Sequence, residues 1–402
     1  MPQLVFQHKE LPDPYRWILP GSKSLSHRYI VAQKLYAPDC LLNNLSSSTD
    51  TQALLKAIEQ PERVHFEDGA TPLRFFIALA AALSWNSTLD AGPRLRQRPI
   101  QDLIHCLGLS PLTQFPYTVE GALAPRSLWE VSTSESSQYL SAILLIAPFV
   151  HGQGNPCQVR YPAEFPSKPY ADMTLKVLEE FGIQQQQNGD ILTLTWTHTK
   201  APTQISIEPD WSSAAFAYNI CLALNSVHIE LPGLRKHSWQ GDSQIQGIYD
   251  HLGIASSETP DGLKIFPRKD HRFTPQAILN LSQMPDSVPA LACAYAFKNE
   301  SVCIEGIENL VFKESNRIEA LMHNFSALGI EHSYQNGSLC IAGSSHARQP
   351  HANIETFQDH RIAMAFALFA VTRPLNLSET QSVNKSFPHF WAGLKDLNFD
   401  WK

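Results

Sequence analysis

The apolar positions of the chain recur in a pattern that predicts the same kind of helix six times. Each instance opens with a small polar or charged cluster and continues as an Ala-rich apolar stretch of helical length. The stretches begin near residues 22, 70, 134, 210, 285 and 359, and the last three intervals are 76, 75 and 74 residues by subtraction. A helix that is apolar on all sides must be surrounded by protein, so we expect these helices inside the molecule.

A second, amphipathic helix follows each buried one and often ends in Gly plus an aliphatic residue. Four such glycines are Gly108, Gly182, Gly253 and Gly329, which suit a helix C-cap that needs positive φ. Short alternating runs such as "ILTLTW" and "SVCIEGI" are typical of strands. Six copies of this unit predict an α/β protein of two domains with three units each. Chance repetition is the alternative, and we disfavour it because both the spacing and the order recur.

Length and charge narrow the class of protein. A chain of 402 residues exceeds one ordinary core, and 43% apolar content supports complete folding. The net charge of −7 argues against general affinity for nucleic acid. The longest apolar run, "YLSAILLIAPFV", is too short to span a bilayer, and the N-terminal residues lack the apolar core of a signal peptide. We expect a soluble cytoplasmic protein that binds neither nucleic acid nor a membrane.

The cysteines are spread along the chain and form no CxxC pair. They are seven in number, an odd count, at Cys40, Cys106, Cys157, Cys221, Cys293, Cys303 and Cys340. Most lie in apolar runs such as "LACAYAF", which favours buried thiols over a disulfide framework. We therefore expect these cysteines to be buried and reduced.

Cations stand at the start of two predicted buried helices. Lys23 and Arg28 open the first, in "PGSKSLSHR", and His360 and Arg361 open the sixth. A helix N-terminus presents unpaired N–H groups and positive dipole, so a polar residue there is usually a cap, as at Asp210. Cations oppose that dipole, and their presence makes sense if an anion neutralises both. We interpret these clusters as phosphate or carboxylate sites.

Two further groups have an ordinary structural explanation when each is taken alone. Arg94, Arg96 and Arg98 lie together before a helix and are equally compatible with a solvated basic loop. Glu314 and Arg317 are i,i+3 neighbours at the start of an amphipathic helix, for which a surface ion pair is the simpler interpretation.

Two single residues complete the candidates. Asp286 stands where an apolar helix begins, so it is either a cap or a carboxylate that acts as a base. Lys385 precedes an aromatic helix in "NKSFPHFW". The chain has no metal-ligand spacing, Walker loop, GxGxxG, GxSxG or Cys/His arrangement. Together these features imply chemistry on two anionic substrates without a metal or cofactor.

At these residues the chain resembles the 5-enolpyruvylshikimate-3-phosphate synthase family of enolpyruvyl transferases. The similarity runs over essentially the whole length. It is carried by eight segments in the family's order: "PGSKSLSHR", "RQRPIQDL", "SESSQYLSAILL", "SKPYADMTL", "MPDSVPAL", "VFKESNRI", "QDHRIAMA" and "NKSFPHFW". Any one segment is weak evidence, but eight in order are highly specific.

The resemblance implies a two-domain inside-out α/β barrel fold, with three βαβαββ units in each domain. The chain would cross between domains near Pro20–Gly21 and near Gln240–Gly241. We thus expect one domain at residues 22–240, which would bind mainly shikimate-3-phosphate. The second would comprise 1–21 plus 241–402 and contribute catalytic carboxylates and cations for phosphoenolpyruvate.

The resemblance also implies the reaction and the residues that perform it. The enzyme would join shikimate-3-phosphate to phosphoenolpyruvate by addition and elimination and release phosphate, as a monomer without cofactor or metal. Shikimate-3-phosphate would be bound by Ser24, Arg28, Ser136, Ser137, Gln138, Ser167, Tyr170, Asn309 and Lys313. Phosphoenolpyruvate would lie against Lys23, Ala70, Arg98, Gln138, Arg317, His360, Arg361 and Lys385. The catalytic residues would be Lys23, Asp286 and Glu314.

The proton transfers are assigned by the same resemblance. Asp286 is expected to take the proton of the 5-hydroxyl, and Glu314, assisted by Lys23, to manage the proton at C3. A dry cleft raises the pKa of a carboxyl whereas nearby cations lower it, so which carboxyl acts as acid is left open. We also expect the substrate anions to draw the two domains together.

One position departs from the family pattern. The family usually has NAGTxxR where this chain has "EDGATPLR", so Ala70 replaces a glycine when Thr71 and Arg74 are aligned. Its methyl group would lie beside the phosphate of phosphoenolpyruvate. We expect weakened sensitivity to glyphosate, which is bulkier than the substrate.

Two other functions would use the same scaffold. The sister enolpyruvyl transferase that acts on UDP-N-acetylglucosamine usually has a Lys–Asn pair in its first motif, whereas Lys23 is followed here by Ser24. A non-catalytic anion-binding protein would be expected to lose a proton-transfer residue or a key cation, and all of them are present.

Overall fold

The computed structural model divides the chain into two compact units. Unit 1 comprises Met1–Pro20 and Glu208–Lys402, and unit 2 comprises Gly21–Ile207. The residues that the structure describes are 2–133, 136–197, 201–268, 277–343 and 351–402.

The second boundary falls after Ile207, and the expected crossing near Gln240–Gly241 is wrong. Helix α7 (Trp211–Leu224) contacts α9 (Val288–Lys298). Strand β12 (Ile229–Pro232) pairs antiparallel with β14 (Gly262–Pro267) and parallel with β2 (Tyr15–Arg16). Residues 208–240 therefore share the core of the C-terminal part of the chain.

The sheets of unit 1 share one pattern of parallel and antiparallel strand pairs. Among its described residues there are three four-stranded sheets, β2-β12-β14-β13, β15-β16-β18-β17 and β19-β20-β1-β21. The further strands are β1 (Gln3–Phe6), β13 (Ile254–Thr259), β15 (Ile278–Asn280), β16 (Val302–Glu305), β17 (His332–Gln335), β18 (Ser338–Ile341), β19 (Ala352–Ile354), β20 (Leu375–Leu377) and β21 (Phe399–Trp401). In each sheet the first pair is parallel and the other pairs are antiparallel. A parallel pair needs a long crossover, which a helix supplies.

Unit 2 repeats this arrangement with fewer strands. Its described residues form the sheets β7-β8-β10-β9, β4-β5-β6 and β3-β11. The strands are β3 (Leu41–Asn43), β4 (Arg63–Phe66), β5 (Ser87–Ala91), β6 (Tyr117–Val119), β7 (Trp129–Glu130), β8 (Pro156–Arg160), β9 (Ile183–Asn188), β10 (Ile191–Trp196) and β11 (Gln204–Ser206). Here too the pairs β7-β8, β4-β5 and β3-β11 are parallel.

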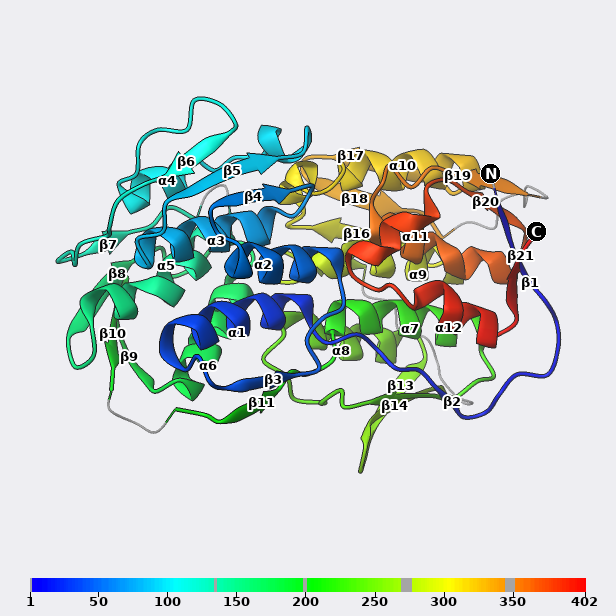
Figure 1. Cartoon of the computed structure of the whole chain (residues 1–402). Coiled ribbons are helices and arrows are strands. Elements are labelled where there is room, and N and C mark those ends of the chain that lie inside the picture. The colour runs from blue at the N-terminus through cyan, green and yellow to red at the C-terminus, as the bar shows by residue number, and fades with distance from the viewer. Residues whose placement is uncertain (1, 134–135, 198–200, 269–276, 344–350) are drawn as a thin grey trace. The chain divides into compact units, whose positions relative to one another are not determined.

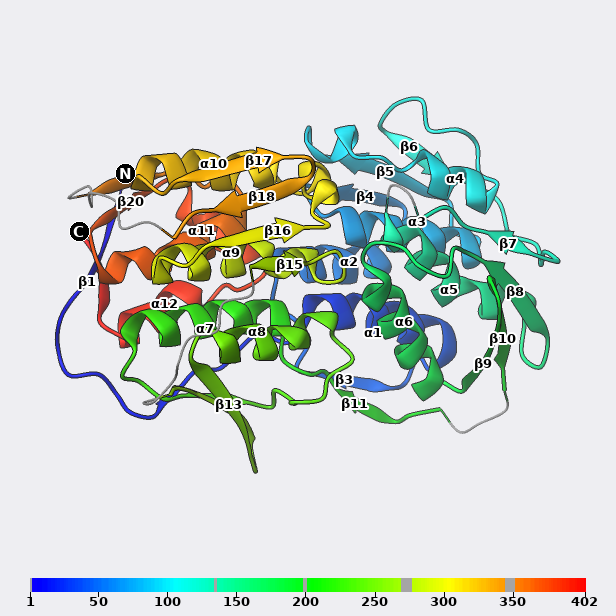
Figure 2. The same ribbon diagram turned by 180° about the vertical axis from the view of Figure 1, so that it is seen from behind.

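The Ala-rich helices form the inside of each unit, as predicted. In unit 2, α1 (Lys23–Tyr36), α3 (Ala70–Ala82) and α5 (Ser137–His151) contact one another. In unit 1, α7, α9 and α11 (His360–Phe366) do the same. Within each unit the sheets lie around these helices (Figures 1 and 2). Small alanine side chains allow this close approach, and both helix triads lie in the hydrophobic cores.

The predicted amphipathic helices are also present. They are α2 (Thr49–Glu59), α4 (Gln101–Leu107) and α6 (Lys168–Glu180) in unit 2, and α8 (Ile245–His251), α10 (Arg317–Leu328) and α12 (Phe390–Asp396) in unit 1. The four glycines predicted at helix ends all have positive φ, between 69° and 92°. Short 3-10 helices are η1 (Leu95–Gln97), η2 (Gly241–Gln244), η3 (Pro285–Ser287), η4 (Glu308–Phe312), η5 (Ala367–Val371) and η6 (Thr380–Lys385). No helix among the described residues is long and apolar enough to cross a membrane.

The two chain crossings separate a strand from the helix that follows it. Strand β2 belongs to unit 1, but the next helix, α1, belongs to unit 2. Strand β11 belongs to unit 2, but the next helix, α7, belongs to unit 1. At the first crossing a Cβ on Gly21 would come within 1.8 Å of the carbonyl oxygen of Asn44, so only glycine fits there.

The expectation of reduced cysteines is wrong for two of the seven. Cys303 on β16 and Cys340 on β18 are opposite each other in the antiparallel pair and form a disulfide, with Cα atoms 4.0 Å apart. The segment of Cys303 was predicted as a strand, but the register in which it pairs with another strand cannot be read from composition. The other five cysteines are free thiols, and four of them are buried.

We expect loss of this disulfide to lower the stability of unit 1. The double variant Cys303→Ser/Cys340→Ser should lose about 2–4 kcal/mol in the free energy of unfolding, because the cross-link no longer restricts the unfolded chain. Urea unfolding with and without dithiothreitol measures the effect, and the double variant should not respond to the reductant. Failure to find a 303–340 cross-linked peptide in the air-oxidised protein would contradict the prediction.

Candidate active site

The guanidinium of Arg317, the first residue of α10, is the centre of a charged cluster in unit 1. Its side chain is 1% exposed, and each nitrogen contacts a different carboxylate. Nε lies 2.8 Å from Asp359 Oδ2, Nη1 lies 3.0 Å from Asp286 Oδ1, and Nη2 lies 2.8 Å from Glu314 Oε2. Burial alone would lower the pKa of Arg317, but the three carboxylates raise it above its usual value. The expected surface ion pair between Glu314 and Arg317 is therefore wrong, because this pair is buried.

Asp286, in η3, faces three cations. Its carboxylate lies 3.0 Å from Arg317, 3.0 Å from Arg361 and 3.3 Å from Lys313. Neither η3 nor α9 has a side-chain N-cap hydrogen bond, so the cap interpretation of Asp286 is wrong. Burial works to raise the pKa of Asp286, but Arg361, Lys313 and Arg317 outweigh it and hold the pKa well below its usual value. At neutral pH this group is ionised and can accept a proton.

Asp359 is a fully buried site residue that the sequence analysis did not assign. It caps α11, where it accepts a hydrogen bond of 2.9 Å from the backbone N–H of Arg361. It also accepts one of 3.1 Å from Ser315 Oγ and pairs with Arg317. Asp359 thus joins the starts of α10 and α11. Its place before His360 in "QDHRIAMA" was the available signal, since Asp is a preferred N-cap residue.

Of the remaining predicted residues of unit 1, Lys385 and His360 lie close to carboxylates of the same cluster. Lys385, the last residue of η6, has its Nζ 3.7 Å from Glu314 Oε1 and is 13% exposed. Asn309 lies in η4, directly before the segment that carries Lys313 and Glu314. His360 is buried at the start of α11, with Nδ1 3.8 Å from Asp359 Oδ1. Four Lys and Arg side chains (Lys313, Arg317, Arg361 and Lys385) and three carboxylates are thus brought together from η3, the η4–α10 segment, α11 and η6.

A further buried carboxylate, Asp242 in η2, supports the turn that holds Asp286. It accepts hydrogen bonds from Ser287 Oγ and, at 3.1 Å, from Ser212 Oγ. Burial, with repulsion from Asp286, raises the pKa of Asp242 to about 6, although the Ser287 hydrogen bond and Arg361 oppose the rise. Sequence reasoning missed Asp242 because both serines come from other segments of the chain.

In unit 2, Arg28 is a buried cation surrounded by neutral oxygens. Its side chain donates to Ser24 O at 2.7 Å, Thr174 Oγ1 at 2.8 Å, Tyr170 O at 2.8 Å and Ser141 Oγ at 3.0 Å. Within the described part of the chain none of its contacts is a carboxylate. Burial lowers the pKa of Arg28 to about 10, so the group remains charged at neutral pH. A buried cation whose partners are all neutral is suited to bind an anionic ligand, because the ligand would compensate its charge.

Arg74 on α3 connects two predicted segments of the site. It donates to Ser136 Oγ at 3.1 Å, to Gln138 Oε1 at 2.6 Å and to the carbonyl oxygen of Pro99. Its guanidinium also lies 5.0 Å from the ring centroid of Tyr139. The buried side chain of Arg74 therefore forms hydrogen bonds with both the Arg98–Pro99 segment and the start of α5. From the sequence, Arg74 served only to align "EDGATPLR" with the family pattern, and no role in the site was predicted for it.

Lys23, the first residue of α1, pairs with Asp50 on α2. The two charged groups are 3.2 Å apart, and the side chains are 16% and 9% exposed. A Cβ on Gly69 would lie 2.9 Å from Asp50 Oδ1, so this carboxylate also lies against the N-terminus of α3. Ala70 is the first residue of α3 and is 5% exposed. Asp50 was not predicted, because it comes from a helix outside the recognised segments.

The other predicted residues of unit 2 stand at helix starts or in the arginine loop. Ser137 is the first residue of α5, and Ser167 is the N-cap residue of α6 in the left-handed region, at φ 66°. Arg98 is half-buried, and its Nε has no hydrogen-bond partner among the described residues. Arg96 instead pairs with Asp90 at 2.7 Å on the exposed side. The solvated-loop interpretation therefore holds for Arg96 but not for Arg98.

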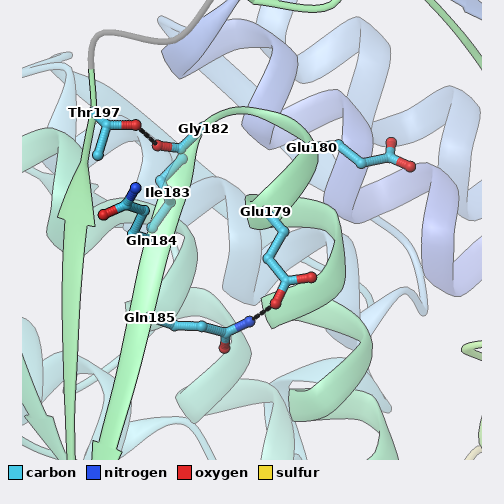
Figure 3. Close-up of a pocket in the computed structure, with 7 residues that line it drawn as sticks. All are labelled: Glu179, Glu180, Gly182, Ile183, Gln184, Gln185 and Thr197. Carbon is cyan, nitrogen blue, oxygen red and sulfur yellow. Dashed lines mark hydrogen bonds between the residues drawn. The ribbon is translucent and has the colours of Figure 1, made fainter.

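A pocket in unit 2 lies apart from these residues. It is formed by the end of α6 and the start of β9, where Thr197 Oγ1 donates to the carbonyl oxygen of Gly182 at 2.7 Å (Figure 3). It is lined by Glu179, Glu180, Gly182, Ile183, Gln184, Gln185 and Thr197. Two carboxylates and no basic group line it, so it does not suit an anionic substrate. Within the described ranges no group of three or more His, Cys, Asp or Glu residues is placed to hold a metal ion.

The unit 1 cluster around Arg317 and the buried cation Arg28 of unit 2 are carried by an α/β fold. This combination is typical of an enzyme that acts on small anionic substrates. The sequence matches the EPSP synthase (3-phosphoshikimate 1-carboxyvinyltransferase) family over residues 58–394. The chain therefore belongs to the EPSP synthase family.

Individual relatives agree with this assignment. The chain is 32% identical over 395 residues to the 3-phosphoshikimate 1-carboxyvinyltransferase of Bacteroides fragilis strain YCH46, covering 96% of this chain and 95% of that protein. It is 30% identical over 403 residues to the Thermococcus kodakarensis enzyme of the same name, with coverages of 94% and 96%. The solved EPSP synthase of Acinetobacter baumannii has the same fold, with a TM-score of 0.77 at 20% identity and full coverage of both chains.

We expect Asp242 to make the stability of unit 1 depend on pH. Its folded pKa of about 6 exceeds the unfolded value of about 4, so the folded state binds the proton more tightly. The stability from this group is fully present below about pH 4 and is lost as the pH rises through about 6. Asp242→Asn should remove about 3 kcal/mol of this dependence, measured by urea unfolding at pH 4 and pH 7.

The exposed Asp261→Asn variant is the control, since Asp261 is 71% exposed in a surface pair with Arg16. It should keep the pH dependence of the wild type. Identical pH dependence in the wild type and in Asp242→Asn would show that Asp242 does not titrate as described.

Proposed function

We propose that this chain transfers the enolpyruvyl group of phosphoenolpyruvate to the 5-hydroxyl of shikimate-3-phosphate and releases phosphate. The observation that carries the proposal is the unit 1 cluster, in which Asp286 and Glu314 both contact Arg317. Two carboxylates for proton transfer are there combined with cations for phosphorylated substrates. Membership of the EPSP synthase family supports the same reaction.

Each unit contributes a different part of the chemistry in this proposal. Unit 2 binds mainly shikimate-3-phosphate, with the buried charge of Arg28 and the hydroxyl and amide donors near Arg74. Unit 1 contributes the carboxylates and most of the cations for phosphoenolpyruvate. Lys23, Ala70 and Arg98 contribute to phosphoenolpyruvate binding from unit 2. All of these residues come from one chain, so the proposal needs no partner subunit.

Asp286 takes the proton of the 5-hydroxyl as that oxygen attacks C2 of phosphoenolpyruvate. Its pKa is held low by Arg361, Lys313 and Arg317, which makes it a weak base before the substrates bind. An anionic substrate that binds Arg361 and Arg317 neutralises part of their charge. The pKa of Asp286 then rises, and the carboxylate becomes a stronger base when the substrate is in place. The same electrostatic interaction that binds the substrate anion thus also raises the basicity of Asp286.

Glu314 manages the proton at C3. Its two oxygens contact Arg317 and Lys385, at 2.8 and 3.7 Å, which keeps the carboxylate in a fixed orientation. Glu314 enters this step protonated, gives its proton to C3 during addition and takes one back during elimination, while Asp286 passes the hydroxyl proton to the departing phosphate. The cations stabilise the negative charge on the tetrahedral species and on the departing phosphate. The proposal requires no metal or cofactor.

We expect phosphate release to require both substrates and Asp286. Asp286→Asn should lower kcat by about 100-fold or more, because a general base is worth roughly two to four orders of magnitude. Inorganic phosphate is measured after mixing phosphoenolpyruvate with shikimate-3-phosphate. Asp250→Asn, in an exposed pair with Arg268 on the same unit, should retain the wild-type rate. If the wild-type protein releases no phosphate when both substrates are present, the proposal is refuted.

Ala70→Gly should increase inhibition by glyphosate. Ala70 is buried at the start of α3, so removing its methyl group opens space at the proposed phosphate subsite. Overpacking by one methyl group costs about 1–3 kcal/mol, which corresponds to an inhibition constant lower by roughly five- to a hundredfold in the variant. Ala82→Gly, at the opposite end of α3, is the control and should leave inhibition unchanged. Equal inhibition of Ala70→Gly and wild type would count against the prediction.

A further inference from the structure

His27 is a buried histidine on the same helix as Lys23 and is not among the residues proposed to bind substrate. It lies on α1 one turn after Lys23 and is 0% exposed. Its Nε2 is 3.1 Å from Thr51 Oγ1 on α2, and its Nδ1 has no hydrogen-bond partner within the described residues. Burying an imidazole with one unsatisfied nitrogen costs free energy, and the contact of Nε2 with Thr51 is the hydrogen bond that the ring retains.

That contact holds the first turn of α2. Thr51 Oγ1 also lies 2.9 Å from Ser48 Oγ, and Ser48 is the N-cap residue of α2, accepting the backbone N–H of Thr51. Asp50, which pairs with Lys23, lies in the same first turn, between Ser48 and Thr51 in the sequence. Helices α1 and α2 are therefore joined by two polar contacts at successive turns of α1. The outer one is the Lys23–Asp50 ion pair and the inner one is His27–Thr51.

The imidazole is neutral in this position. Burial is the main cause that lowers the pKa of His27 to about 3; Asp50 on α2 opposes this shift, and Lys23 and Arg28 on α1 contribute to it. A neutral ring does not compete with Lys23 for the carboxylate of Asp50. His27 can therefore fix the position of α2 without disturbing the adjacent ion pair.

We propose that His27 is a positioning residue for Lys23. By its hydrogen bond to Thr51 it holds the start of α2 against α1, so that Asp50 keeps the ammonium group of Lys23 in place. The consequence for phosphoenolpyruvate rests on the proposed function, in which Lys23 binds that substrate. The effect on the Lys23–Asp50 pair itself does not rest on it.

Three variants test this contact. His27→Leu and Thr51→Val each remove the hydrogen bond with little change of volume, and the double variant should be no worse than either one. Each should raise KM for phosphoenolpyruvate by about tenfold, the effect expected for one buried hydrogen bond, and leave KM for shikimate-3-phosphate unchanged. His27→Gln places an amide where Nε2 was and cannot titrate, so it should restore wild-type behaviour.

Tyr36→Phe is the matched control for simple destabilisation. It removes another buried hydrogen bond of α1, the 2.6 Å contact from the Tyr36 hydroxyl to Leu145 O. Its melting temperature should fall much as it does in His27→Leu, but KM for phosphoenolpyruvate should not change. If His27→Leu loses stability and keeps the wild-type KM, His27 is a packing residue only and the proposal is overturned.

A second measurement tests the positioning role of His27 without an assay of enzyme activity. The pKa of Lys23 is followed by NMR of lysine-labelled protein, with Lys23→Arg to assign the signal. A paired carboxylate raises the pKa of an ammonium group, so a loosened pair in His27→Leu should lower the pKa of Lys23, whereas Tyr36→Phe should not. An unchanged Lys23 pKa in His27→Leu would refute the positioning role. Absence of phosphate release by the wild type would instead refute only the proposed function.

Discussion

The buried charge of Arg317 is the constraint on which the unit 1 site depends. A guanidinium that is 1% exposed must be compensated, and here three carboxylates from separate segments do so. Removing one partner of a buried ion pair typically costs about 3–5 kcal/mol, because it leaves the other charge uncompensated. The positions of Asp286, Glu314 and Asp359 are therefore imposed by folding itself. The interaction that stabilises the unit also holds Asp286 and Glu314, the carboxylates that we propose for proton transfer, in fixed positions.

The two units bury their central cations in different ways, and the difference matches the roles proposed for them. Arg28 is surrounded by neutral oxygens, so its charge is left for an incoming anion. Arg317 is surrounded by carboxylates, so an incoming anion must compete with them, including the two proposed for proton transfer. The first arrangement suits binding. In the proposed function, the second couples binding to a change in the basicity of Asp286.

The sequence predicted what is local and failed where the outcome depends on distant partners. All-round apolar stretches identified the six inner helices, because such helices can only be enclosed by protein, and the terminal glycines followed from the φ they need. Strand register is not local, so the pairing of Cys303 with Cys340 was missed. The same reason explains the misplaced crossing at Gln240 and the unassigned Asp242. Family motifs located the unit 1 residues, but only α11 and η3 explain why Arg317 is buried rather than exposed.

Because the chain crosses between the units twice, unit 1 is built from two segments that are far apart in the sequence. This has a consequence for folding during synthesis on the ribosome. Strand β1 is made first but pairs with β20 and β21, which are made last, and β2 pairs with β12. Unit 2, in contrast, is one uninterrupted segment whose final strand, β11, closes on β3. All of unit 2 is thus available while the N-terminal strands still lack their partners. Translation therefore lets unit 2 fold first and keeps unit 1 incomplete until the last residues emerge.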